Sequence, residues 1–306
     1  MKPTLTVSVG VPAYNEESNI QYLLSNIESQ EEKNFIITEI IIVSDASTDN
    51  TGALIEKFAK KSSLHIRLIR NQTRKGQNVC QNIILNKARG DIGVLLEADS
   101  LLKSKDGLFQ LIFPILFKRA DASYAHSIPL ESRSFIGKTL TFVEKCKSLS
   151  FLRHKNGKNI FTCHSGKALT RQFAEEFRWT PNIPEDSFFY LSSLRLRKKI
   201  LFSKNALIYF MPPQTMKDYI LKTTKFKNGV KLLKNYFPAN LLKKESSLSY
   251  LYFIALFSQL IKNPVYTSMY TLLYLASVIY KFSLQDYTSK WEISYSTKLL
   301  IDQYEK

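Results

Sequence analysis

Apolar strands and amphipathic helices alternate along the first hundred residues of the chain. Residues 5–12, LTVSVGVP, predict a buried strand, and residues 16–30 carry apolar side chains at helical spacing. The same unit then recurs, with strands expected at 39–45, 65–71, 92–99, 123–129 and 200–211 and helices at 51–61 and 76–90. This alternation is typical of a largely parallel sheet covered by helices.

Polar side chains gather where three of these strands end. The segment AYNEE (13–17) follows the first strand, SDASTDNT (44–51) follows the second, and EADS (97–100) ends a later one. In an open parallel sheet the carboxyl ends of the strands form the ligand crevice. The pattern therefore predicts a ligand site at this edge.

Glu97 and Asp99 are the acids that end the strand expected at 92–99. They could be ordinary surface acids, since strand ends are often charged. They could instead bind a divalent cation, because hard cations prefer carboxylate and phosphate oxygens. Their position at the crevice edge favours the cation site.

Several nucleotide-binding classes are excluded by what the chain lacks. No G-x-G-x-x-G follows the first strand and no G-x-x-x-x-G-K-[ST] occurs, so neither a dinucleotide-binding dehydrogenase nor a P-loop enzyme is expected. The N-terminal stretch lacks the long apolar region of a signal peptide, and export by that route is not expected. Three widely spaced cysteines indicate a reducing cytosol.

The net charge of +17 points to an anionic partner. Between residues 187 and 244 there are 13 Lys or Arg and one acid, a balance of +12. Nucleic acid, an acidic membrane surface and phosphorylated small molecules would all fit this charge. No aromatic–basic RNA motif or recognition helix accompanies it, so no nucleic-acid partner is expected.

Five segments together resemble one enzyme family. VSVGVPAYNEE, IIIVSDASTDNT, RKGQNVCQNIILNKARGD, LLEADS and PEDSFFY occur in the order and spacing of family-two glycosyltransferases, over roughly residues 5–235. The resemblance implies a GT-A fold, an α/β class with a mostly parallel Rossmann-like sheet flanked by helices. It also implies inverting transfer of a sugar from a nucleotide-diphosphate sugar, most often a UDP-sugar.

The resemblance assigns the donor side to the first two polar segments. The loop after the first strand would cradle the base and ribose through Pro12, Ala13, Tyr14 and Glu16. The acid after the second strand, Asp45, would accept a hydrogen bond from the base.

Some of these residues have a structural alternative. Asn15 and Glu16 could cap the following helix, and Asp49 is interpreted as a helix cap. Arg74 and Lys75 lie where relatives approach the diphosphate, or they are solvated loop charges. Asp91 is interpreted as structural.

The resemblance also places a cation and a base. EADS stands where the family has D-x-D, so Asp99 is the expected Mg²⁺ or Mn²⁺ ligand. Glu97, one methylene longer than the usual acid, is a departure from the family and is expected among the residues that bind the nucleotide sugar. In PEDSFFY, Asp186 is the expected general base that takes a proton from the acceptor hydroxyl. The alternative for Glu185 and Asp186 is a helix N-terminus, where acids are favoured.

The acceptor side is expected around Ser165, Gly166 and Glu185, with Cys163 and His164 as lining or core. Further along, KTTKF (222–226) stands where processive relatives carry Q-x-x-R-W. The Gln and the Trp are absent, which favours transfer of a single sugar to a glycan or lipid-linked acceptor.

Two uncharged tracts follow, at 246–261 and 263–280. Each lies near the lower length limit of a spanning helix, so they are either packing helices, with an oligomer surface as one option, or a membrane-attaching pair. We expect residues 1–240 to form the catalytic domain and 241–306 a C-terminal helical segment of apolar helices. That segment would hold the enzyme on the cytoplasmic face of the cell membrane as a peripheral pair or a hairpin, with Lys281 near the anionic headgroups.

Three rival functions stay open at this point. A sugar-1-phosphate nucleotidyltransferase would use a similar sheet, but its glycine-rich opening loop is absent. A non-catalytic sugar-nucleotide-binding protein attached to the membrane is favoured by Glu97 and by the degenerate KTTKF. Nucleic-acid binding has only the net charge in its favour.

Overall fold

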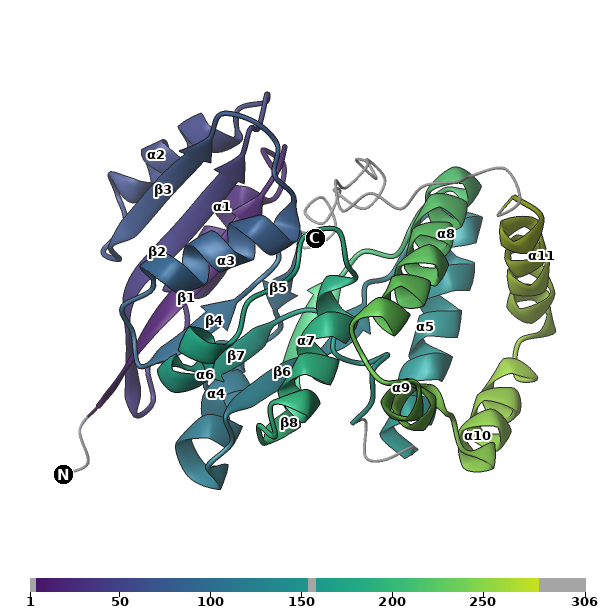
Figure 1. The fold of residues 1–306 in the computed structure, drawn as a ribbon. Helices are drawn as coiled ribbons and strands as arrows, with labels where there is room; N and C mark the ends of the chain where they lie inside the picture. The colour runs from purple at the N-terminus through teal and green to yellow at the C-terminus, as the bar shows by residue number, and fades with distance from the viewer. Residues whose placement is uncertain (1–3, 154–157, 281–306) are drawn as a thin grey trace.

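An eight-stranded sheet forms the centre of the part of the protein that the structure describes, a computed structural model covering residues 4–153 and 158–280 (Figure 1). The strand order is β3-β2-β1-β4-β7-β6-β8-β5. The strands are β1 (Leu5–Ala13), β2 (Phe35–Asp45), β3 (Ile66–Asn71), β4 (Ile92–Leu95), β5 (Leu101–Leu102), β6 (Ala122–Pro129), β7 (Lys167–Thr170) and β8 (Ile200–Phe210).

Helices cover both faces of this sheet. Figure 1 shows α3 (Gln77–Lys87), α6 (Arg171–Glu176) and α7 (Glu185–Arg195) on the near face, with α1 (Ile20–Glu28), α2 (Thr51–Ala59) and α4 (Gly107–Lys118) on the far face. Successive residues of β2 supply the two cores, because side chains alternate along a strand: Ile40 and Ile42 join the core under α1, whereas Ile41 and Val43 join the core under α3.

The predicted elements are confirmed for the first half of the chain, with two differences. β4 ends at Leu95, so Leu96 to Asp99 form a loop rather than the end of a strand. β7 runs antiparallel to β4 and β6, and β5 runs antiparallel to β8, so the sheet is mixed at these strands. Asp91 accepts hydrogen bonds from the Thr6 amide (2.9 Å) and hydroxyl (2.7 Å), which confirms its structural role beside β1.

A helical layer lies beside the sheet (Figure 1). It contains α5 (Phe135–Arg153), α8 (Met216–Leu232), the short η2 (Leu233–Asn235), α9 (Ala239–Ser246), α10 (Tyr250–Leu260) and α11 (Pro264–Tyr280). α10 and α11 pack on α5, and α11 also packs on α8, so these C-terminal helices contact the part of the chain before residue 240. The proposed boundary at 240 stays a prediction.

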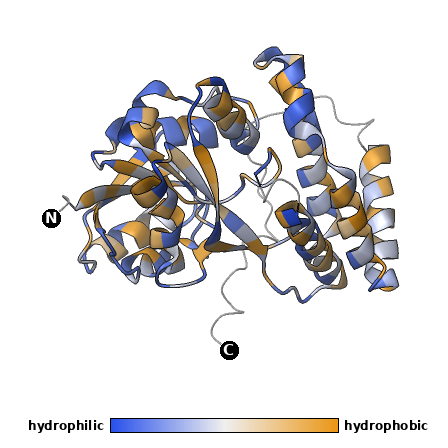
Figure 2. Ribbon diagram, turned by 90° about the horizontal axis from the view of Figure 1, so that it is seen from below, coloured by the Kyte–Doolittle hydropathy of each residue, from blue (hydrophilic) through white to orange (hydrophobic). Residues whose placement is uncertain are grey.

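The C-terminal apolar helices are present, and they expose much of their apolar surface. Within residues 4–153 and 158–280, no helix has both the length and the apolar character required to cross a membrane. Figure 2 shows hydrophobic residues along the strands of the sheet and also on the helices at its side. The rest of the predicted C-terminal segment, residues 281–306 with Lys281, lies outside the described residues.

Candidate active site

The three polar segments lie at one edge of the sheet, as predicted. β2, β1 and β4 are neighbours and run parallel, so their carboxyl ends at Asp45, Ala13 and Leu95 point the same way. Parallel strands bring the loops that follow them to one edge. The loop after β1 therefore meets the loops after β2 and β4.

The loops after β1 and β2 are tied together by hydrogen bonds. Asn15 adopts a left-handed conformation (φ 52°), its amide donates to Ser47 Oγ (3.1 Å), and its Oδ1 accepts from the Thr48 amide (2.8 Å). The Glu16 amide donates to Thr51 Oγ1 (2.7 Å). The side chain of Asn15 thus links the loops after β1 and β2 rather than capping α1.

The residues at the starts of α1 and α2 differ from the predicted helix caps. Glu16 Oε2 accepts from Asn19 Nδ2 (3.0 Å), and the N-cap of α1 is Asn19, which makes no side-chain capping bond. The N-cap of α2 is Asn50, and the preceding Asp49 accepts from the Thr51 amide through Oδ1 (3.0 Å), so Asp49 binds the first amide of α2 from one position before the N-cap.

Asp45 is buried, and residues of its own chain engage both of its oxygens. Oδ1 accepts from Asn71 Nδ2 (2.8 Å) and the Lys75 amide (2.9 Å), and Oδ2 accepts from the Gly76 amide (2.7 Å). Gly76 adopts φ 93°, a conformation that glycine tolerates at no steric cost. The carboxylate therefore ties the loop at Lys75 and Gly76 to the end of β2, and its bond to a base stays a prediction.

Tyr14 and Arg74 stack on each other at this edge of the sheet. The Arg74 guanidinium lies 3.8 Å from the centroid of the Tyr14 ring, a short cation–π contact. The basic loop at residues 74–75 is thus docked on the loop after β1, next to the place expected for a diphosphate. Pro12 and Ala13 occupy the last two positions of β1, at the base of the same loop.

Asp99 lies among other acids in the loop after β4. Burial, with the negative charges of Glu16 and Glu97, raises the pKa of Asp99 to about 7, and the opposing Lys222 on α8 lowers it. Oxygen ligands with excess negative charge suit a hard divalent cation. The chemistry of this donor set fits Mg²⁺ or Mn²⁺ at Asp99.

A second acidic group joins Glu97, from the same loop as Asp99, to the two acids at the start of α7. One carboxylate oxygen from each of Glu97, Glu185 and Asp186 lies within 4.8 Å of the others, a spacing that would also suit a cation. This group is called the acid trio below, and a positive charge, the ammonium of Lys167, already lies beside it. Lys167 Nζ lies 2.9 Å from Glu185 Oε2 and 2.7 Å from Asp186 Oδ1.

Asp186, in the first turn of α7, is the accessible member of its pair with Glu185. Its side chain is 33% exposed, and Oδ2 lies 3.7 Å from His164 Nδ1. Burial alone would raise the pKa of Asp186, but the Lys167 ammonium outweighs it and holds that pKa well below its usual range. Asp186 is therefore ionised at neutral pH.

Glu185 behaves in the opposite way, although it is the next residue. Its side chain is 8% exposed, and burial, reinforced by the charge of Asp186, raises the pKa of Glu185 well above its ordinary value. Within the described residues its Oε1 has no hydrogen-bond partner. The two neighbouring carboxyl groups therefore have pKa values that are shifted in opposite directions. The buried Glu185 has little surface to offer an acceptor, and its acceptor-side assignment stays a prediction.

Ser165 and Gly166 form the turn between His164 and β7. Ser165 Oγ donates to Glu97 Oε2 (3.2 Å), so Glu97 is linked to the predicted acceptor side rather than left free in solvent. Gly166 adopts φ 69°, and a Cβ there would lie 2.3 Å from Ile208 Cδ1. Only glycine fits this turn without a rearrangement.

Sequence reasoning missed Lys167. It follows directly after the predicted turn in HSGKALT, yet a lone Lys at the start of a short strand reads as a solvated charge. Only its burial shows otherwise, since its side chain is 3% exposed. Buried lysines need partners, and the partners here lie on α7.

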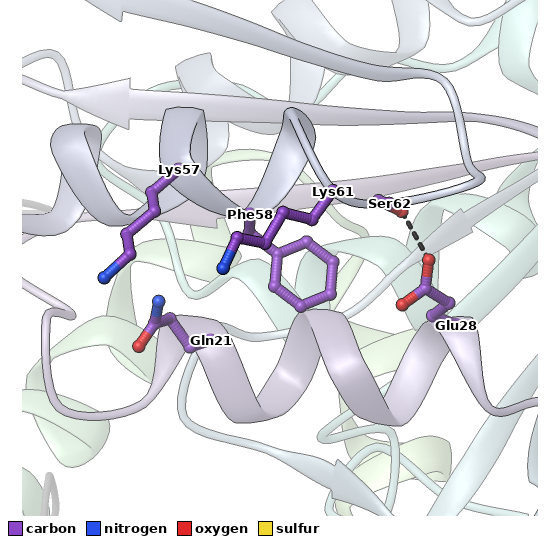
Figure 3. A pocket seen from close by; sticks show the side chains of 6 residues that line it. All are labelled: Gln21, Glu28, Lys57, Phe58, Lys61 and Ser62. Atoms are coloured by element: carbon purple, nitrogen blue, oxygen red, sulfur yellow. Dashed lines mark hydrogen bonds between the residues drawn. The ribbon is translucent and has the colours of Figure 1, made fainter.

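A pocket away from this edge does not belong to the site. It has a volume of about 140 Å³ and lies between α1 and α2, lined by Gln21, Glu28, Lys57, Phe58, Lys61 and Ser62 (Figure 3). Glu28 accepts a hydrogen bond from Ser62 Oγ (2.6 Å). The pocket is small for a ligand site, which usually measures about 300–1,000 Å³.

Comparison with known proteins agrees with this arrangement. The model of glycosyl transferase family 2 matches residues 8–178, more than half of the chain. A Campylobacter jejuni protein, GalNAc(5)-diNAcBac-PP-undecaprenol beta-1,3-glucosyltransferase, is 25% identical, and the match covers 88% of this chain and 87% of that protein. Several other relatives match over only about 27–33% of their own length.

Two solved structures share the fold. The mannosyltransferase PcManGT from Pyrobaculum calidifontis, in complex with GDP-Man and Mn²⁺, has a TM-score of 0.62 at 18% identity and covers 99% of this chain and 89% of its own. The 1–349 fragment of TarS from S. aureus, in complex with UDP-GlcNAc, has a TM-score of 0.52 at 17% identity and covers 98% and 92%. The chain belongs to glycosyl transferase family 2 and is a glycosyltransferase with the GT-A fold.

Proposed function

We propose that this enzyme transfers a single sugar, with inversion, from a nucleotide-diphosphate sugar to a glycan or lipid-linked acceptor. The observation that carries the proposal is Asp186, an ionised and partly exposed carboxylate at the same sheet edge as the nucleotide loops and Asp99. The complexes of two structural neighbours with GDP-Man and with UDP-GlcNAc support a nucleotide-sugar donor, and we favour UDP. The Campylobacter relative, named for an undecaprenol-linked substrate, supports a lipid-linked acceptor.

The donor would lie in the crevice between the loops after β1 and β2. Pro12, Ala13, Tyr14 and Glu16 would surround the nucleoside, with Asp45 at the base, and Lys75 would lie beside the diphosphate. Asp99 would hold Mg²⁺ or Mn²⁺, which when bound would supply positive charge for the departing diphosphate. The Tyr14–Arg74 stack and the hydrogen bonds of Asn15 hold these loops in place before the donor arrives.

Asp186 would act as the general base. As the acceptor oxygen forms its bond to the anomeric carbon, the bond from that carbon to the diphosphate oxygen breaks, and the hydroxyl proton passes to Asp186. Oδ1 is held by Lys167, so Oδ2 is the oxygen that faces His164 and is available to the acceptor. Attack from the side opposite the leaving group inverts the configuration of the anomeric carbon.

A donor panel tests this function. We expect one nucleotide sugar, supplied with Mn²⁺ and candidate lipid-linked acceptors, to release its nucleoside diphosphate, and EDTA to abolish the release. Release is measured by a coupled diphosphate assay. If a donor binds in calorimetry but none turns over with any acceptor, transfer is refuted and a non-catalytic sugar-nucleotide-binding protein is favoured.

We also propose that α10 and α11 lie on the cytoplasmic face of the cell membrane. Large apolar side chains on these helices and at the C-cap of α10 are exposed to solvent: Tyr250, Leu251, Phe253, Ile254, Phe257, Ile261, Val265, Leu272, Leu275 and Ile279. Basic residues Lys243, Lys244 and Lys262 flank α10. Apolar residues that enter the headgroup region beside lysines that attract anionic lipids are the two features of a surface-lying helix.

Replacing two exposed rings tests this attachment. We expect Phe253→Ser with Phe257→Ser to weaken binding to anionic phosphatidylglycerol vesicles by about tenfold or more, because both rings lose their burial in lipid. Co-sedimentation of the full chain measures the change. Phe117→Ser is the matched control, since Phe117 on α4 is exposed to a similar degree (53%, against 55% for Phe253) outside these helices. Equal binding of the two variants would contradict the proposal.

A further inference from the structure

Lys167 is a buried lysine in the middle of the active site. It is the first residue of β7, and its three ammonium hydrogens all have partners: Glu185 Oε2 (2.9 Å), Asp186 Oδ1 (2.7 Å) and the His164 carbonyl (2.6 Å). An ammonium group has three donors and no acceptor. Lys167 therefore has no hydrogen left for a substrate, and its role lies within the protein.

The ammonium occupies the place that a cation would take in the acid trio. Glu97 also acts on it, since the charges of Asp186, Glu185 and Glu97 together raise the pKa of Lys167 against the effect of its burial. A divalent ion bound by Glu185 and Asp186 would have to lie next to this ammonium. Two unscreened positive charges a few ångströms apart repel strongly in a buried site.

We propose that Lys167 is a built-in cation of the active site, which positions Asp186 and excludes the divalent ion from the acid trio. The ion is thereby directed to Asp99, on the donor side of the crevice. This inference rests on the proposed function only for the role of Asp186 as base. The claim about the acid trio concerns cation binding and does not depend on the proposed function.

Lys167 fixes one oxygen of Asp186 and leaves the other accessible. Asp186 lies in the first turn of α7 with a side chain that is one-third exposed, so without an anchor its carboxylate could rotate between the crevice and solvent. A side chain placed by strand β7 removes that freedom. Lys167 is thus a positioning residue, because it acts through Asp186 rather than on the sugar.

The first test measures Mn²⁺ binding by variants of the acids that all keep Lys167. The full chain is titrated with Mn²⁺ alone, and free Mn²⁺ is followed by electron paramagnetic resonance. We expect Glu185→Gln and Asp186→Asn to bind Mn²⁺ within about threefold of the unmodified protein, whereas Asp99→Asn binds it at least tenfold more weakly. A tenfold loss in Glu185→Gln or Asp186→Asn would place the ion in the acid trio and overturn the proposal.

Removal of the lysine gives the second test. We expect Lys167→Ala to bind one more Mn²⁺ per chain than the unmodified protein, and Lys167→Ala with Asp186→Asn to lose that extra ion. Lys198→Met is the matched control: Lys198 is also largely buried, with 11% of its side chain exposed and Nζ 2.7 Å from Glu176 Oε2. A folded Lys167→Ala protein that gains no Mn²⁺ would overturn the proposal. If this variant does not fold, the first test still decides.

Kinetics separate positioning from a purely structural role. In Lys167→Ala we expect kcat to fall about 100-fold with the donor KM within threefold, and added ethylammonium to restore part of kcat. If the donor KM rose by as much as kcat fell, and ethylammonium restored no kcat, the positioning role would be refuted. If the proposed function is wrong, the unmodified protein will show no turnover. Both Mn²⁺-binding tests can still be interpreted in that case.

Discussion

Asp186→Asn is expected to lower kcat by about 10³-fold and to leave donor binding within about threefold. The amide has the shape of the carboxylate but cannot accept the proton of the acceptor hydroxyl, and general-base catalysis contributes about 10²–10⁴-fold. A 10³-fold loss corresponds to about 4 kcal/mol of transition-state stabilisation. Steady-state kinetics give kcat, and calorimetry with the nucleotide sugar gives the binding constant.

The control for this variant is another acid in the first turn of a helix. Asp218 occupies that position in α8, as Asp186 does in α7. We expect Asp218→Asn to keep kcat within about twofold, which removes the effect of a helix-terminal charge from the comparison. If Asp186→Asn kept more than a third of the activity, Asp186 would not be the base.

Asp99→Asn is expected to lower kcat/KM by about 10²-fold or more at a fixed Mn²⁺ concentration and to weaken Mn²⁺ binding. The variant removes a carboxylate that lies near the negative charges of Glu16 and Glu97. A carboxylate is a far stronger ligand than an amide for a hard cation. Initial rates against Mn²⁺ concentration measure both effects. Glu28→Gln, in the separate pocket between α1 and α2, is the control and should match the unmodified protein.

The pH dependence of Mn²⁺ binding gives a second test of Asp99 as the metal ligand. Burial and the neighbouring negative charges raise the pKa of Asp99 to about 7, so below pH 7 a proton competes with the ion for this carboxylate. The Kd for Mn²⁺ should therefore rise about tenfold per pH unit below pH 7 and stay nearly constant above it. In Asp99→Asn this dependence should disappear. A flat profile between pH 5.5 and 8 in the unmodified protein would contradict the assignment.

The periodicity of the sequence predicted most of the sheet, because local patterns determine those elements. Ile20, Leu23, Leu24 and Ile27 lie at helical spacing, and all four are buried on one face of α1. β7 was not predicted, since KALT is four residues long and has no clear period. Its antiparallel place between β4 and β6 depends on backbone pairing with strands distant in sequence.

For the polar segments too, the sequence predicted the location but not the contacts. Their order after β1, β2 and β4 was enough to predict a shared edge, because parallel neighbours bring their carboxyl ends together. The partners within that edge were not predictable: Asn15 binds the loop at Ser47 and Thr48, and Asp45 binds the loop at Lys75 and Gly76. These contacts join residues about 30 positions apart, and no local pattern encodes the distance between their atoms.

By itself, the sequence determined the alternation of strands and helices, the edge where the polar segments meet, and the family to which its motifs are similar. Each of these depends on residue type and spacing along the chain. The tertiary structure decided the chemistry of neighbouring acids: Glu185 is buried with a raised pKa, Asp186 is ionised and accessible, and Lys167 contacts both. Adjacent carboxyl groups differ in this way because their pKa values depend on burial and on the distance to a charge, and only folding sets both.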